Sequence, residues 1–282
     1  MAGLRARGLT MLRLVTALAT ALVTLLASAT LFPHASLANE RPSPRTGMTE
    51  VTQSNPMFRP FRVSLSVTYR GIKAGKSILT LERLEGNLWR YRSSNRARGL
   101  FRLVFPEDIS QYSEILIEQD GIRPQRYVAD DGTTDTSRDI ELIFDWSQGT
   151  IRGSAEQQPV FLTMDEEVVL DPMSVQLALM RDLALGRSPD HYWLADKTQL
   201  KRYVYRFEEQ TTLQIAGKSL TTVVWSSQRE GSDRVTRVWH AKELGFMPVK
   251  AERRRGDRME WSMLAETYDW DTSQVSGKVT PR

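Results

Sequence analysis

The segment DPMSVQLALMRDLALG, residues 171–186, predicts the one clear helix of this chain. Asp171 is a favourable N-cap, Pro172 suits the first helical position, where no N–H partner is needed, and Gly186 is a natural C-terminal stop. Apolar side chains recur at helical spacing in two adjacent rows, Met173, Leu177, Met180 and Ala184 in one and Val175, Leu179 and Leu183 in the other. Such a wide apolar face predicts a helix that is largely buried.

Around this helix the sequence follows the two-residue period of β-strands. Residues 61–69, FRVSLSVTY, alternate apolar and polar side chains without a break. Roughly a dozen such segments, separated by turns rich in Gly, Asn and Asp, follow between residues 61 and 267. The pattern predicts a mainly β protein with a curved antiparallel sheet, a barrel or half-barrel, and one buried or lid helix. Residues 97–106 lack clean alternation and predict a short helix or a loop over the sheet edge.

The N-terminal residues have the features of a secretory signal peptide. Arg5, Arg7 and Arg13 precede an apolar run over residues 14–32, and small residues lead up to Ala38. We predict cleavage after Ala38 and release into a periplasm, with Ala29 as a second possible site and an uncleaved anchor as the alternative. The domain prediction is a signal peptide at 1–38, a flexible lead-in at 39–60, a single β-rich domain at 61–270 and a flexible tail at 271–282.

Composition removes several classes of function. The chain has no cysteine, so a disulfide, a thiolate metal site and a thiol nucleophile are all impossible. The signal peptide holds three of the 38 Lys and Arg residues and none of the 34 Asp and Glu residues, which leaves 35 against 34, a net charge of +1. This near balance gives no electrostatic case for nucleic acid as a partner. We also predict no stable membrane span after signal cleavage.

Five short motifs, in this order, resemble a known family. They are VTYRGIKAG (67–75), GIRP (121–124), DIELIFDW (139–146), DPMS (171–174) and ELGFMPV (243–249). The combination resembles the bacterial exported proteins grouped as domain of unknown function 3108 (DUF3108), over residues 61 to about 267. The resemblance implies a periplasmic, mainly β protein, similar to half-barrel folds that carry lipids or lipoproteins across the periplasm. It implies no established activity and no catalytic residue.

The sequence indicates neither a metal site nor a cofactor. The mature chain has only His191 and His240, which are far apart and lack metal-ligand spacing. Four acidic residues, Asp130, Asp131, Asp135 and Asp139, suggest calcium, but the spacing of a calcium loop is missing and hairpin turn chemistry explains them more simply. No nucleophile elbow and no phosphate-binding glycine loop is present in the sequence. We therefore predict no metal, no cofactor and no identifiable catalytic residue.

Aromatic and Met side chains are the candidates for ligand contact. On a curled sheet they could line an apolar cavity, and the alternative is a solid core. The candidate ligand-binding residues are Tyr69, Trp146, Met173, Leu177, Met180, Tyr205, Trp225 and Trp239. The candidate anion contacts are Arg253, Arg254, Arg255 and Arg258, for which a solvated hairpin turn is the simpler interpretation.

These features favour a non-enzymatic periplasmic protein that binds or shelters a lipid, an acyl chain or another apolar ligand in cell-envelope maintenance. Enzymatic activity stays open. One alternative is a hydrolase acting on glycan or peptidoglycan, which would need a cleft with two opposed carboxylates. Another is a protein-interaction module of the envelope that docks a partner through exposed strand edges or through Leu100 and Phe101.

Overall fold

The computed structural model describes residues 58–103, 105–166 and 168–270. The predicted signal peptide, most of the lead-in and the predicted tail lie outside these residues. Phe58, inside the predicted lead-in, is buried in the main core. Within the described residues, no helix combines the length and the hydropathy that crossing a membrane requires.

The strands all belong to one sheet, and the helices are short. The strands before the α-helix are β1 (Phe61–Tyr69), β2 (Ile72–Glu85), β3 (Leu88–Ala97), β4 (Ile109–Ile117), β5 (Ile122–Asp130), β6 (Ile140–Asp145), β7 (Thr150–Ala155), β8 (Gln158–Thr163) and the short β9 (Val169–Leu170). The strands after it are β10 (His191–Asp196), β11 (Gln199–Ile215), β12 (Lys218–Arg229), β13 (Arg234–Ala241), β14 (Met247–Arg255) and β15 (Arg258–Asp269). The α-helix is α2 (Ser174–Ala184), and the 3-10 helices are η1 (Gly99–Leu103), η2 (Thr136–Arg138) and η3 (Lys242–Leu244).

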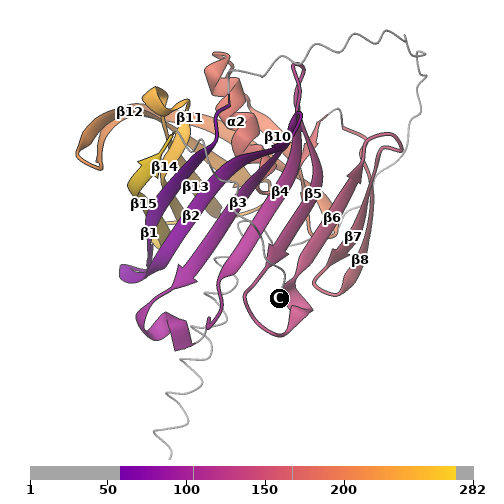
Figure 1. The fold of residues 1–282 in the computed structure, drawn as a ribbon, viewed down its shortest axis with the longest axis horizontal. Helices are drawn as coiled ribbons and strands as arrows, with labels where there is room; N and C mark the ends of the chain where they lie inside the picture. The colour runs from indigo at the N-terminus through magenta and orange to yellow at the C-terminus, as the bar shows by residue number, and fades with distance from the viewer. Residues whose placement is uncertain (1–57, 104, 167, 271–282) are drawn as a thin grey trace, which may run out of the picture.

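The first and the last strand of the domain are neighbours in the sheet. The strand order runs β8-β7-β6-β5-β4-β3-β2-β1-β15-β14-β13-β12-β11-β10-β9, so that β1 pairs with β15 in the middle. All neighbours are antiparallel except β9 and β10, which are parallel. The sheet curves without closing (Figure 1), which confirms the predicted curved antiparallel sheet in its half-barrel form.

The concave face of the sheet holds the core because its strands alternate as the sequence predicts. In β1 the apolar residues from Phe61 to Tyr69 are buried, whereas Arg62 is exposed. The helix α2 packs into this concave face near its upper end in Figure 1, against β5 of the opposite half. Seven of its eleven residues are buried, which confirms the prediction of a buried helix.

The helix begins and ends close to the predicted residues. The helix begins at Ser174 with Met173 at the N-cap position, two residues after the predicted Asp171. The Asp171 carboxylate still accepts hydrogen bonds at this end of the helix, from the backbone N–H groups of Met173 at 2.7 Å and Ser174 at 2.9 Å. At the other end, Gly186 has φ +70°, a left-handed conformation that glycine adopts without strain. A contact that the sequence does not reveal fixes the helix to the sheet, because Ser113 Oγ in β4 donates to Asp171 Oδ2 at 2.6 Å.

Two strands differ from the sequence prediction, whereas residues 97–106 agree with it. The short strands β9 and β10 flank α2 and were not predicted, because the first has only two residues and the second, HYWLAD, does not alternate cleanly. Residues 97–106, predicted as a short helix or a loop, contain η1, and Phe105 after it is buried against the lower end of the sheet.

Candidate functional site

A cavity of about 90 Å³ lies in the concave face between the start of α2 and strands from both halves of the sheet. Its walls come from β1–β4 on one side and from β13–β15 on the other, and Pro172, Met173 and Gln176 of the helical segment complete them. Most of the lining is apolar, from residues such as Leu65, Leu79, Tyr91, Val238, Ala251 and Met263. A cavity of this size has room for a few waters or for a short apolar segment.

Three buried polar atoms in the residues that line this cavity have no hydrogen-bond partner among the described residues. They are Ser77 Oγ, Asn95 Oδ1 and Trp261 Nε1. A buried polar atom without a partner costs about 1–3 kcal/mol. The residues around the cavity therefore include a hydroxyl, an acceptor and an N–H donor that are buried without a partner among the described residues.

A smaller recess of about 30 Å³ adjoins the cavity, since Gln176 and Thr236 line both. Arg229, Arg234 and Arg253 line the recess, together with serine and tyrosine side chains. The side chain of Arg253 is only 2% exposed, and its Nε donates to Thr236 Oγ1 at 3.2 Å. Burial lowers the pKa of Arg253 to about 10, so the guanidinium is still cationic at neutral pH.

The candidate ligand-binding residues are dispersed over the concave face. Met173 lines the cavity and Tyr205 lines the recess. The remaining candidates pack in the core: Leu177, Met180, Trp225 and Trp239 in the main cluster, Tyr69 in a smaller cluster at the lower end, and Trp146 partly buried at the margin, with its Nε1 donating to Pro124 O at 2.7 Å. For these, the structure shows packing contacts, as the solid-core alternative describes.

The four candidate anion-contact arginines are divided by a bulge in the β14–β15 ladder. The register shifts between Arg253 and Arg254, and only Arg253 points to the concave face. Arg254, Arg255 and Arg258 are exposed at the hairpin turn. The sequence alone did not separate the buried arginine from the three at the surface.

Sequence reasoning missed the polar residues of the cavity wall. In β3 the buried positions are Trp89, Tyr91, Ser93 and Asn95, so two polar residues continue the inward-facing row of an otherwise apolar strand. Inward-facing polar residues on a strand of this kind are the signal that could have found them.

Two buried carboxyl groups have raised pKa values, and both have structural partners. Burial raises the pKa of Asp171 and of Asp196. Asp171 binds the first turn of α2, and Asp196 accepts hydrogen bonds from Lys201 Nζ at 2.9 Å and Tyr203 Oη at 3.3 Å. Across the described residues, no carboxylate side chain lines the cavity or the recess, so neither space offers the paired carboxylates that the hydrolase alternative requires.

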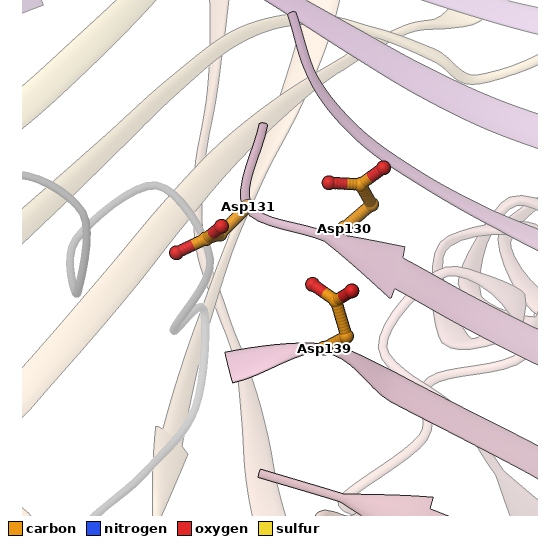
Figure 2. Close-up of side chains that lie close together, drawn as sticks. All are labelled: Asp130, Asp131 and Asp139. Atoms are coloured by element: carbon orange, nitrogen blue, oxygen red, sulfur yellow. The ribbon is translucent and has the colours of Figure 1, made fainter. Parts of the chain in front are cut away.

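Three of the four acidic loop residues converge at the lower end of the sheet (Figure 2). Carboxylate oxygens of Asp130, Asp131 and Asp139 lie within 4.8 Å of one another, and in the figure Asp139 points toward Asp130. Burial raises the pKa of Asp139, and the charges of Asp130 and Asp131 add to this shift. Turn hydrogen bonds occupy part of the cluster, since Asp130 Oδ1 accepts from Gly132 N at 2.7 Å and Asp131 Oδ1 from Thr133 N at 3.1 Å. These bonds are the hairpin chemistry that the sequence predicts.

Three solved structures resemble this chain at low sequence identity. A β-barrel-like protein of the domain of unknown function DUF1849 from Brucella abortus is 11% identical, with a TM-score of 0.47 and coverage of 75% of this chain and 97% of that one. A proposed exported protein with a YmcC-like fold from Bacteroides fragilis is 7% identical (TM-score 0.31; coverage 75% and 96%). A proposed lipoprotein from Parabacteroides distasonis is 6% identical (TM-score 0.30; coverage 76% and 97%).

None of these TM-scores reaches 0.5, so the function of this chain has to be argued from its own geometry. A search of curated proteins gave no match. The family model matches residues 64–257, well over half of the chain. This range includes all five motifs noted in the sequence. The chain therefore belongs to the DUF3108 family of proteins of unknown function.

Proposed function

We propose that this is a non-enzymatic periplasmic protein that binds an amphiphile, with its apolar chain in the cavity and an anionic head group at the recess, in the service of cell-envelope maintenance. The observation that carries the proposal is the continuity of an apolar cavity with a recess lined by three arginines, one of them buried. The periplasmic location rests on the N-terminal sequence pattern.

The two spaces suit the two ends of such a ligand. Each methylene transferred from water into the cavity gains about 0.8 kcal/mol. At the recess, a carboxylate or phosphate can accept charge-assisted hydrogen bonds from guanidinium groups, which hold anions in a fixed geometry. Gln176 and Thr236 lie at the junction, where the chain of the ligand would meet its head group.

A chain-length series tests the proposal. Residues 39–282 are prepared without detergent, and binding of saturated fatty acids of increasing length is measured by titration calorimetry. We expect the Kd to fall about fourfold with each added methylene until the cavity is filled, and then to level off. Native mass spectrometry of the same preparation, followed by organic extraction, identifies any amphiphile that co-purifies.

A matched pair of variants assigns the binding to the cavity. Ala251→Leu adds volume to the cavity wall and should shorten the chain length at which the Kd levels off. Ala184→Leu makes the same change at an exposed position of α2 and should leave the series unaltered. Absence of saturable binding at every chain length, or equal effects of the two variants, would overturn the proposal.

A further inference from the structure

The 3-10 helix η1 contacts β2 at the lower end of the sheet, opposite α2 in Figure 1, and large apolar side chains of both elements are exposed. Leu100 and Leu103 of η1 are 71% and 83% exposed, and Ile72, the first residue of β2, is 60% exposed. The segment is held against the sheet, because Arg98 N donates to Ala74 O at 2.8 Å and the Phe101 ring packs edge-on against Tyr69 at 6.3 Å. The two leucines therefore project from an anchored turn.

Basic residues surround these apolar side chains. Arg70, Lys73 and Arg98 are exposed beside them, and none of the three forms an ion pair with another described residue. The β14–β15 hairpin lies at the same end, since Arg70 N donates to Glu260 O at 3.1 Å, and it adds the exposed residues Arg254, Arg255 and Arg258. Arg254 forms an ion pair with Glu252 and Arg255 with Asp233, so these two are partly neutralised. We call this surface, formed by residues 70–73, 98–103 and 254–258, the basic tip.

Acidic groups border the basic tip on more than one side. The hydrogen bond from Lys76 and the nearby charges of Arg98 and Lys73 lower the pKa of Glu266. Asp108 forms ion pairs with Arg102 at 3.3 Å and with Arg96 at 3.7 Å. The acidic loop after β5 is at the same end of the sheet, because Asp130 pairs with Ser110 of β4, the strand that follows η1. An anionic surface would thus be attracted by the basic tip and repelled by the acidic loop beside it, which sets the orientation of the protein on that surface.

We propose that the basic tip docks this protein on an anionic membrane surface, with Leu100 and Leu103 inserted at the boundary between head groups and acyl chains. Exposed leucines lose contact with water when they enter that boundary, and each nearby Lys or Arg adds attraction to anionic lipid. The arginine-lined recess also lies toward this end of the sheet. Arg229 and Arg234 flank the β12–β13 turn, and Arg234 lies opposite Arg255 in the ladder between β13 and β14. Docking by the tip would bring the recess close to the membrane that supplies or receives an amphiphile.

Vesicle co-sedimentation tests the docking surface, with vesicles of phosphatidylglycerol mixed with phosphatidylcholine compared with vesicles of phosphatidylcholine alone. We expect binding to the mixed vesicles that weakens as salt is raised. The double variant Leu100→Ser, Leu103→Ser should weaken binding at least about tenfold, and Lys73→Glu with Arg98→Glu should abolish the preference for anionic lipid.

Phe161→Ser is the matched control, because Phe161 is 65% exposed on the edge strand β8 and lies outside the basic tip. It should bind vesicles like the unaltered protein. No binding of the unaltered protein to mixed vesicles, equal binding to both kinds of vesicle, or equal losses in the leucine variant and the control would each overturn the proposal. The leucine variant leaves the cavity intact, so its fatty-acid chain-length series should not change, and this keeps the docking surface separate from the proposed ligand site.

Discussion

Replacing Asp171 with alanine should lower the free energy of unfolding by about 3 kcal/mol. The carboxylate is buried, and its Oδ1 accepts from two backbone N–H groups of the first helical turn. Loss of an N-cap of this kind costs about 1 kcal/mol. The variant also leaves the buried hydroxyl of Ser113 without its 2.6 Å bond, at a further cost of about 1–3 kcal/mol.

Urea unfolding followed by circular dichroism measures this change. The urea midpoint should fall without a change in the slope of the transition, and the melting temperature should drop by about 6–12 °C. Asp171→Asn keeps one acceptor oxygen for the helix and should lose only about 1 kcal/mol. The control is Asp257→Ala at an exposed hairpin turn, which should stay within about 0.5 kcal/mol of the unaltered protein. A loss below about 1 kcal/mol for Asp171→Ala would refute the assigned role.

Two further predictions concern stability and use the same measurement. Gly75→Ala should cost about 1–3 kcal/mol, because the new Cβ would lie 2.2 Å from the backbone oxygen of Arg96, whereas Gly121→Ala, with open space around it, should be nearly neutral; equal effects would contradict this reasoning. Burial lowers the pKa of His240 to about 4, so the unfolded chain takes up a proton before the folded one, and about 3 kcal/mol of stability should be lost as the pH falls from about 6.5 to 4. His240→Gln should lack this part of the pH dependence, and an unchanged pH profile in that variant would show the assignment to be wrong.

The polar wall of the cavity shows why the candidate site could be predicted only in part. Met173 was identified because it faces the core side of a helix that has a clear local pattern. Asn95 and Trp261 lie in strands far apart in the sequence, and their convergence on one cavity depends on the pairing of β1 with β15. Local periodicity indicates which face of a strand is buried, but it does not indicate which distant strand that face meets.

The four adjacent basic residues give a second example. Arg253, Arg254, Arg255 and Arg258 look equivalent in the sequence, as a charged hairpin turn. Arg253 faces the concave side in alternation with Ala251 and joins Arg229 and Arg234 at the recess, and a bulge directly after it separates it from the three exposed arginines. Bulges of this kind depend on how two strands fit against each other, and they leave no reliable local signal.

The sequence by itself determined the mainly β fold, the position and burial of the helix, and the family. These follow from periods of two and of 3.6 residues and from capping residues, all of which act over a few neighbouring positions. Only the tertiary structure decided that the sheet stays open, that Ser113 holds the helix to β4, and that cavity, recess and basic tip lie where they do. The physical reason is that each of these features is made by residues from strands far apart in the chain, whose meeting is set by the packing of the whole sheet.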